Sequence, residues 1–139
     1  MKSNNVKKAR EDREQAFALL FEKSFSDSTF DEIIDGAAEA RDIIISDRAR
    51  KYAEDIFADI ENIDSNIEKH LHARSKARLS HVVLALLRVS VYEIINGVVE
   101  APVSINEAVE LAKKYSSLDE AGFVNGVLGS FVREREQQG

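Results

Sequence analysis

The sequence has 139 residues, of which 44% are hydrophobic, with no cysteine and a formal net charge of −6. A chain of this length can bury a sizeable core as one domain. The lack of cysteine excludes disulfides, thiolate metal sites and cysteine nucleophiles, and it is typical of proteins in a reducing, intracellular environment. No apolar segment follows the N-terminal lysines, and the longest apolar run, Val82 to Leu87, is far shorter than the ~20 residues of a membrane span, so we expect a cytoplasmic protein.

The N-terminal part of the chain predicts two helices. Ala, Glu, Leu, Lys and Arg are abundant and proline occurs once, which favours an all-α fold with few or no strands. From about residue 6 to residue 25 the apolar residues recur at helical spacing, and the basic residues occupy the first two turns. A start signal at Ser28-Thr29 then precedes a second, shorter helix whose apolar stripe begins at Phe30.

Three further helices are predicted in the middle. Ser46 or Asp47 can cap a helix that runs to about Ile60, because a short side-chain oxygen can accept from the free amides of a first turn. By the same argument Asp64 is expected to cap a helix over residues 65–71. Residues 77–96 are apolar nearly all round, which is typical of a helix at the centre of a bundle.

The C-terminal part predicts two more helices. Asn96-Gly97 can end the central helix. Ser104-Ile105-Asn106-Glu107 spells a capping box, and Ser117-Leu118-Asp119-Glu120 repeats it before the last apolar face, which extends to Val132. We therefore expect about seven helices in a single domain, residues 1–139, and leave open a division into two helical lobes joined near Ile63 to Lys76.

Two segments break the acidic composition. The first 13 residues hold five basic residues against two acidic ones, a net +3, which leaves −9 for the rest of the chain. Residues 69–88 contain five more basic residues, three histidines and no acidic residue. A basic helical turn suits nucleic-acid phosphates, whereas the alternative for either segment is a solvated surface that only offsets the acidic charge.

No constellation of catalytic or metal-binding residues is apparent. His70 and His72 are two positions apart and point to different sides of a helix, and no metal-ligand spacing is present. Gly122, Gly126 and Gly129 follow no strand, so neither a phosphate-binding loop nor a dinucleotide fingerprint is expected. We expect no metal, no cofactor and no enzyme activity, and we assign these glycines to close helix packing or to close approach of a ligand.

Three blocks of sequence resemble the NusB family. Residues 102–113 (PVSINEAVELAK) with 123–128 (FVNGVL) resemble its C-terminal signature, and residues 87–93 (LRVSVYE) resemble its central-helix motif. Residues 8–21 resemble its arginine-rich first helix. The resemblance implies an all-helical bundle that binds the boxA element of ribosomal RNA transcripts as single strand, together with NusE, a small-subunit ribosomal protein. It also implies transcription antitermination, in which the complex helps RNA polymerase read through terminators, and a role in ribosome biogenesis.

The resemblance also implies candidate site residues. The expected phosphate contacts are Lys2, Lys7, Lys8, Arg10 and Arg13. Phe123 is a candidate for base stacking, and Asp119 or Asn125 for recognition of a base edge. The structural alternatives are that Phe123 fills the core, that Asp119 caps its helix and that Asn125 makes a buried hydrogen bond.

The resemblance also implies contacts with a protein partner, for which the expected residues are Phe21, Glu22, Val83 and Tyr92. Arg88 is expected in a buried ion pair with Glu93 or Glu107.

Two other functions stay open at this level. One is a protein-binding or self-associating module, including a homodimer, in which the basic N-terminal end has no role. The other is an accessory RNA-recognition domain of a ribosomal RNA methyltransferase, for which a catalytic domain would have to follow Gly139. The sequence leaves undetermined the oligomeric state, the preferred RNA, the NusE contact surface and any RNA contact by residues 69–88.

Overall fold

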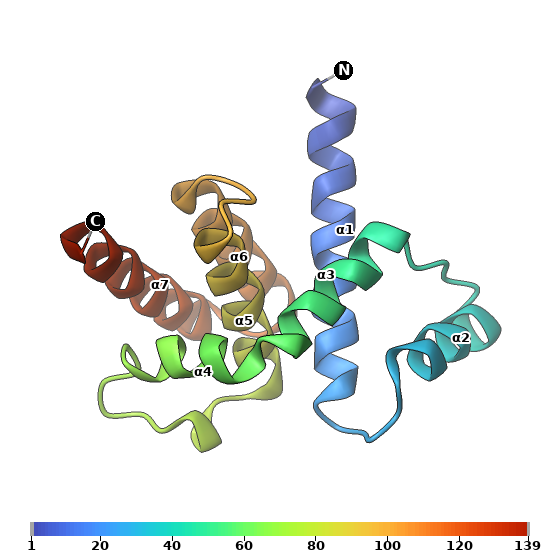
Figure 1. The fold of residues 1–139 in the computed structure, drawn as a ribbon, viewed down its shortest axis with the longest axis horizontal. Helices are drawn as coiled ribbons and strands as arrows, with labels where there is room; N and C mark the ends of the chain where they lie inside the picture. Colours follow the sequence, from blue (N-terminus) through green and yellow to red (C-terminus); the bar gives the residue numbers. More distant parts are fainter. Residues whose placement is uncertain (1, 139) are drawn as a thin grey trace. The chain divides into compact units, whose positions relative to one another are not determined.

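A computed structural model describes the backbone of residues 2–138 and the side chains of residues 4–138, and every regular element in this range is a helix. The predicted all-α fold is confirmed. The described residues form seven α-helices and one short 3₁₀ helix, η1, and Figure 1 labels the α-helices in chain order. Their bounds are α1 (Lys2–Lys23), α2 (Phe30–Arg41), α3 (Asp47–Ala58), α4 (Ile60–Glu68), η1 (Lys76–Arg78), α5 (His81–Ile95), α6 (Ala101–Tyr115) and α7 (Leu118–Gln138).

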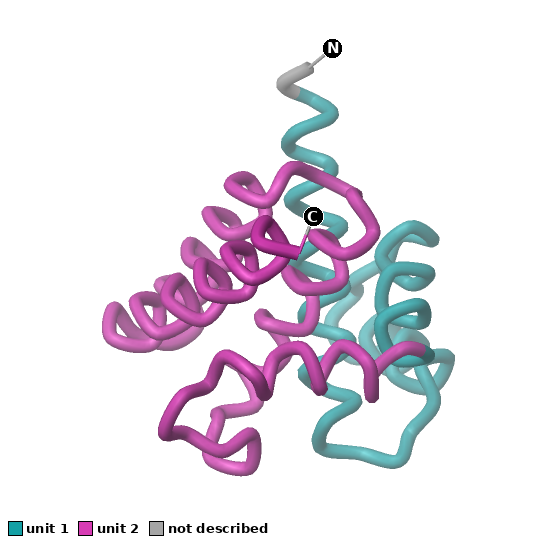
Figure 2. The backbone as a smooth tube through the Cα atoms, turned by 60° about the vertical axis from the view of Figure 1, so that its left-hand side comes forward, with its two compact units in different colours: residues 1–58 teal, residues 59–139 magenta. Residues whose placement is uncertain are grey.

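The chain divides into two compact units, residues 1–58 and residues 59–139 (Figure 2). The division falls directly before α4, whereas the sequence suggested a joint between residues 63 and 76. The first unit holds α1 to α3, and the second holds α4 to α7 with η1.

The first unit is built on α1, which packs against both α2 and α3. All three helices contribute to its core, which consists of Ala16, Phe17, Leu19, Leu20, Ile33, Ala49, Ala53 and Ile56. Thr29 caps α2 with a complete capping box, since its hydroxyl accepts from the Glu32 amide at 3.1 Å and the Glu32 carboxylate accepts from the Thr29 amide at 3.1 Å. Ser46, rather than Asp47, caps α3 by accepting from the Ala49 amide at 3.0 Å.

The second unit is built around α5, which contacts α4, α6 and α7. Buried side chains cover most of the circumference of this helix, as its largely apolar sequence predicts. They are Val83, Ala85, Leu86, Leu87, Val89, Ser90, Val91 and Glu93. One stripe, His81, Leu84, Arg88, Tyr92 and Ile95, is partly or fully exposed. Residues 77–80 were expected inside the central helix, but residues 77 and 78 belong to η1 and Leu79 precedes the Ser80 cap. The Ser80 hydroxyl accepts from the Val83 amide at 3.1 Å.

Two predicted helix caps are wrong because their side chains bond to distant partners. Asp64 lies inside α4 and pairs with Arg88. Ser104 lies inside α6, which begins at Ala101 with Pro102 in its first turn, and its buried hydroxyl donates to Glu93 at 2.8 Å. Both residue types are common at caps, yet a buried polar partner elsewhere in the fold decides their place here.

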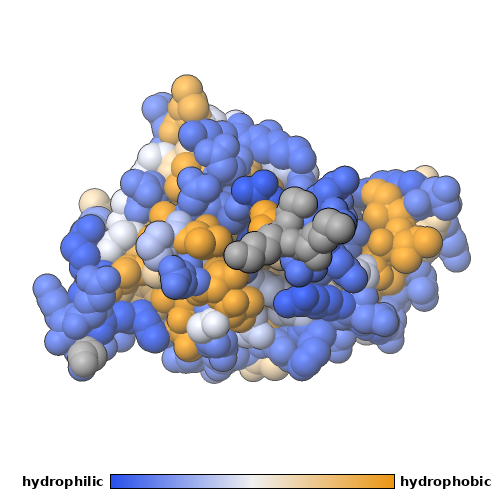
Figure 3. All heavy atoms as spheres, turned by 90° about the horizontal axis from the view of Figure 1, so that it is seen from above, coloured by the Kyte–Doolittle hydropathy of each residue, from blue (hydrophilic) through white to orange (hydrophobic). Residues whose placement is uncertain are grey.

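Hydrophilic residues dominate the face drawn in Figure 3, where the apolar ones gather in separate patches. Among the described residues, no helix is both long enough and apolar enough to cross a membrane.

Candidate nucleic-acid interface

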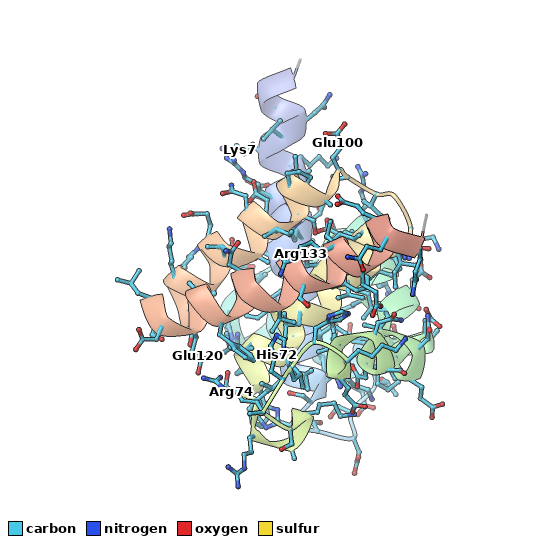
Figure 4. All side chains as sticks on the ribbon, turned by 90° about the vertical axis from the view of Figure 1, so that its left-hand side faces the viewer. Lys7, His72, Arg74, Glu100, Glu120 and Arg133 are labelled. Atoms are coloured by element: carbon cyan, nitrogen blue, oxygen red, sulfur yellow. The ribbon has the colours of Figure 1, made fainter. Side chains whose placement is uncertain are left out.

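The first turns of α1 carry exposed basic side chains. Lys7, Lys8 and Arg10 are all exposed, and Figure 1 shows these turns projecting beyond α2 and α3 of the same unit. Lys7, labelled in Figure 4, and Lys8 form no ion pair with another described side chain. The predicted phosphate contact at Lys2 concerns a side chain that lies outside the described ones.

The backbone of α1 reinforces the positive character of this end. The first turn contains no acidic residue, and Lys7 and Lys8 follow in the next turn. Because the free amide groups at a helix N-terminus carry partial positive charge, lysines there do not stabilise the helix, whereas an anion does. This end of the helix is therefore suited to phosphate groups.

Arg13 does not belong to this exposed set. Its side chain is buried, at 5% relative exposure, so the guanidinium is not presented at the surface. The predicted phosphate contact at Arg13 is therefore wrong for this structure. The reason is helical geometry, because Arg13 lies three residues before Ala16 and four before Phe17, which places it on the core face of α1.

Polar bonds hold α1 against the segment before α3. The Ser46 hydroxyl donates to the Asp12 carboxylate at 2.7 Å. The Gln15 amide group donates to the Ile44 carbonyl at 3.2 Å and accepts from the Ser46 backbone amide at 3.0 Å. Asp12 and Gln15 were not singled out from the sequence, because their partners lie about 30 residues away. They fix the helix that presents Lys7, Lys8 and Arg10.

The second unit presents the other predicted RNA residues on α7. Phe123 is half-buried, and Asp119 and Asn125 are exposed. Ser117 caps the helix by accepting from the Glu120 amide at 3.1 Å, which removes the alternative that Asp119 is the cap. The exposure of Asn125 removes the alternative that it makes a buried hydrogen bond. Asp119 shares a helix face with Phe123, four residues apart, whereas Asn125 points to another side.

Two glycines of α7 leave open surface beside Phe123. A Cβ atom added at Gly122 or at Gly126 would meet nothing within 4 Å outside the helix itself. Close helix packing therefore does not explain these two glycines. At Gly129, by contrast, an added Cβ would lie 3.3 Å from the Arg133 guanidinium.

The sequence did not single out Arg74 for this site. Its guanidinium carbon lies 4.0 Å from the centroid of the Phe123 ring, and Nη1 lies 3.3 Å from a carboxylate oxygen of Glu120. Figure 4 shows Arg74 and Glu120 next to each other at the start of α7. The only available signal was the basic character of residues 69–88, which did not identify an aromatic partner 49 positions away.

Two other basic residues of this stretch, Lys76 and Arg88, pair with acidic residues of their own unit. Arg88 bonds Asp64 through two nitrogens, each at 2.8 Å, and Lys76 lies 3.3 Å from Asp64 and 3.5 Å from Glu68. The predicted ion pair of Arg88 is confirmed, but Asp64 is its partner instead of Glu93 or Glu107. Burial raises the pKa of Asp64, but the hydrogen bonds and charges of Arg88 and Lys76 together outweigh it and hold the pKa below its ordinary value. Lys69 and Arg78 stay exposed.

The three histidines do not form a cluster. His70 is buried, its Nδ1 lies 2.8 Å from the Ser130 hydroxyl, and its ring packs edge-on against Phe131, whereas His72 and His81 are exposed. Among the described residues there is no group of three or more histidine or carboxylate side chains placed to hold a metal ion.

The predicted partner-binding residues differ in accessibility. Phe21, Glu22 and Tyr92 are partly exposed, and Glu22 accepts from Arg41 at 3.3 Å. Val83 is fully buried on α5, so a direct contact with a partner protein at Val83 is wrong for this structure. Because most residues of α5 are apolar, the spacing of its apolar residues did not show that Val83 lies on a buried side of the helix.

Comparison with known proteins gives a consistent family. The family model described as "NusB family" matches residues 10–133. The chain is 40% identical over 129 residues to the transcription antitermination protein NusB of Clostridium novyi, which covers 89% of this chain and 97% of that protein. It is 37% identical over 131 residues to NusB of Fervidobacterium nodosum, covering 93% of each.

A solved structure shares the fold. It is the crystal structure of antitermination factors NusB and NusE in complex with dsRNA, with a TM-score of 0.78 and 31% sequence identity over 91% of this chain and 96% of that one. That complex contains both a protein partner and RNA.

Proposed function

The chain belongs to the NusB family, and on that premise we propose that it is a transcription antitermination factor that binds RNA together with NusE. The relatives are named transcription antitermination proteins, and the related complex holds NusB, NusE and dsRNA. The chain acts as an adaptor in the cytoplasm and has no catalytic site of its own.

One observation carries the proposal on this chain. Although the protein is acidic overall, Lys7, Lys8 and Arg10 lie exposed on the first turns of α1. The partial positive charge of the helix N-terminus adds to theirs. Such a segment binds phosphates by releasing counterions, and long cationic side chains reach the backbone of RNA without reading its sequence. Sequence recognition then falls to α7, with Phe123 for stacking and Asp119 or Asn125 for base edges.

The RNA that we assign is the boxA element of ribosomal RNA transcripts, bound as a single strand. The antitermination complex of RNA polymerase is the assembly in which the chain then acts. Phe21, Glu22 and Tyr92 are the partly exposed candidates for the NusE contact.

The experiment is a titration of fluorescently labelled boxA-like RNA with the full chain, with and without NusE, as single strand and as duplex. We expect saturable binding of the single strand that is tighter with NusE and that weakens as salt rises. Negligible binding with and without NusE at low salt would contradict the proposal. The solution mass of the free chain, measured in the same buffer, shows whether a homodimer competes with RNA.

A further inference from the structure

Arg74 covers one face of the Phe123 ring. The guanidinium carbon lies 4.0 Å from the ring centroid, which is stacking distance. A Glu120 carboxylate oxygen accepts from Nη1 of the same guanidinium at 3.3 Å. Phe123 and Glu120 are three residues apart on α7, so one helix face holds Arg74 at two points.

The outer side of this arginine is accessible. The Arg74 side chain has 47% relative exposure although its guanidinium rests on Phe123. A guanidinium is planar and weakly hydrated, and a second planar group can stack on its free face. The structure thus offers a flat surface made of an aromatic ring covered by a guanidinium.

The surroundings leave room for a planar ligand. Gly126 follows Phe123 by three residues and is exposed, with open space where a side chain would stand. Asp119 precedes Phe123 by four residues on the same helix face, and its carboxylate is exposed. A carboxylate there can accept a hydrogen bond from an N–H group on the edge of a stacked ligand.

Glu120 disfavours a phosphate at the same place. Its carboxylate occupies an edge of the guanidinium and compensates its charge, so a phosphate would lose the bidentate bonding that makes arginine a strong phosphate ligand. Stacking uses the face of the guanidinium and is compatible with the Glu120 contact.

We propose that Arg74 binds an unpaired nucleobase of RNA by stacking, with Phe123 supporting the guanidinium from below and Glu120 positioning it. The proposal rests on the proposed RNA-binding function and adds a residue to it. It also makes the base contact indirect for Phe123, because Arg74 lies between the ring and the base.

The decisive variant is Arg74→Lys, which keeps the positive charge and removes the plane. We expect the complex of this variant with NusE to bind single-stranded RNA about fivefold or more weakly than the wild type, with an unchanged dependence on salt. The stack is detected with the fluorescent base 2-aminopurine, placed at each position of the RNA in turn. At one position we expect the fluorescence to change when the wild type binds, and to change less when Arg74→Lys binds. The matched control is Arg135→Lys, since Arg135 lies 5.7 Å from the centroid of the buried Phe131 ring, and there we expect wild-type binding.

A second variant separates stacking from a phosphate contact. Arg74→Ala is expected to weaken binding without changing the salt slope, because Glu120 already compensates the charge. A shallower slope for Arg74→Ala, or wild-type affinity and fluorescence for Arg74→Lys, would overturn the inference while the proposed function stands. Failure of the wild type itself to bind RNA would overturn the proposed function, and the inference with it.

Discussion

Arg88 donates to both carboxylate oxygens of Asp64, from Nε and from Nη2, with each distance at 2.8 Å. The two residues lie 24 positions apart, on α5 and α4, and their side chains have only 13% and 9% relative exposure. The Asp64 carboxylate thus supplies the opposite charge and two hydrogen-bond acceptors, which allow the Arg88 guanidinium to be largely buried beside the central helix.

Asp64→Ala is expected to lower the free energy of unfolding by about 3–5 kcal/mol, because it leaves the Arg88 guanidinium buried without this partner. Urea unfolding followed by circular dichroism measures the change. The control is Glu110→Ala, which removes the exposed pair with Lys113 at 3.2 Å and should cost no more than about 0.5 kcal/mol. Equal effects of the two substitutions would show that burial of the first pair has no energetic consequence.

The same pair predicts a dependence of stability on pH. The folded pKa of Asp64 is lowered, because the bonds and charges of Arg88 and Lys76 outweigh the opposing effect of burial. A lowered carboxylate pKa adds stability above the unfolded value of about 3.9, and this contribution is lost as pH falls through that value toward the folded pKa. The free energies of unfolding of the wild type and of Asp64→Asn, compared from pH 6 to pH 3, should therefore begin to approach each other below about pH 4. A constant difference over the whole range would contradict the assignment.

The capping box of α2 predicts a separable effect. Thr29→Ala should cost about 1 kcal/mol of stability, since the Glu32 amide loses its acceptor. The pKa of Glu32 is lowered first by the Thr29 backbone amide and then by the Thr29 hydroxyl. In the variant we expect this pKa to rise while staying below its ordinary value, as measured by NMR titration. The control is Ser28→Ala, which leaves the box intact, and an unmoved Glu32 pKa in Thr29→Ala would refute the hydroxyl's part.

A buried serine pair supports the contact between α5 and α6. The Ser104 hydroxyl donates to Glu93 at 2.8 Å and lies 2.7 Å from the Ser90 hydroxyl, and all three side chains are buried. Ser104→Ala should destabilise the chain by about 1–3 kcal/mol because it removes a donor to a buried carboxylate. Thermal unfolding measures this, with the exposed Ser117→Ala expected to cost less, in the range of a helix cap. No loss of stability in Ser104→Ala would mean that Glu93 is satisfied without it.

Most of the fold follows from patterns that are local in the sequence. Apolar spacing predicted the number and order of the helices, and Thr29 and Ser117 cap where their sequence context indicates. Asp64 and Ser104 also resembled caps, but each bonds a residue on another helix, and the spacing within one helix carries no information about such a partner. The extent of burial of Arg13 and Val83 depends on packing in the same way.

The candidate site was predictable to a similar degree. The exposed positions of Lys7, Lys8 and Arg10 agree with the basic pattern of the first turns. Arg74 stands in a loop, and its stacking on Phe123 arises only when the segment after α4 folds against α7.

The measurement that tests the central claim most directly is the salt dependence of RNA binding by Lys7→Gln/Lys8→Gln, in complex with NusE, against the wild type. The account predicts weaker binding and a slope of log K against log salt that is shallower by about 0.7 for each phosphate of single-stranded RNA that the variant no longer neutralises. The matched control is the double variant Lys113→Gln/Lys114→Gln, which changes two consecutive exposed lysines at the end of α6. The salt slope of this control should equal that of the wild type. Identical slopes for all three proteins would contradict the claim that the N-terminal turns of α1 bind RNA phosphates.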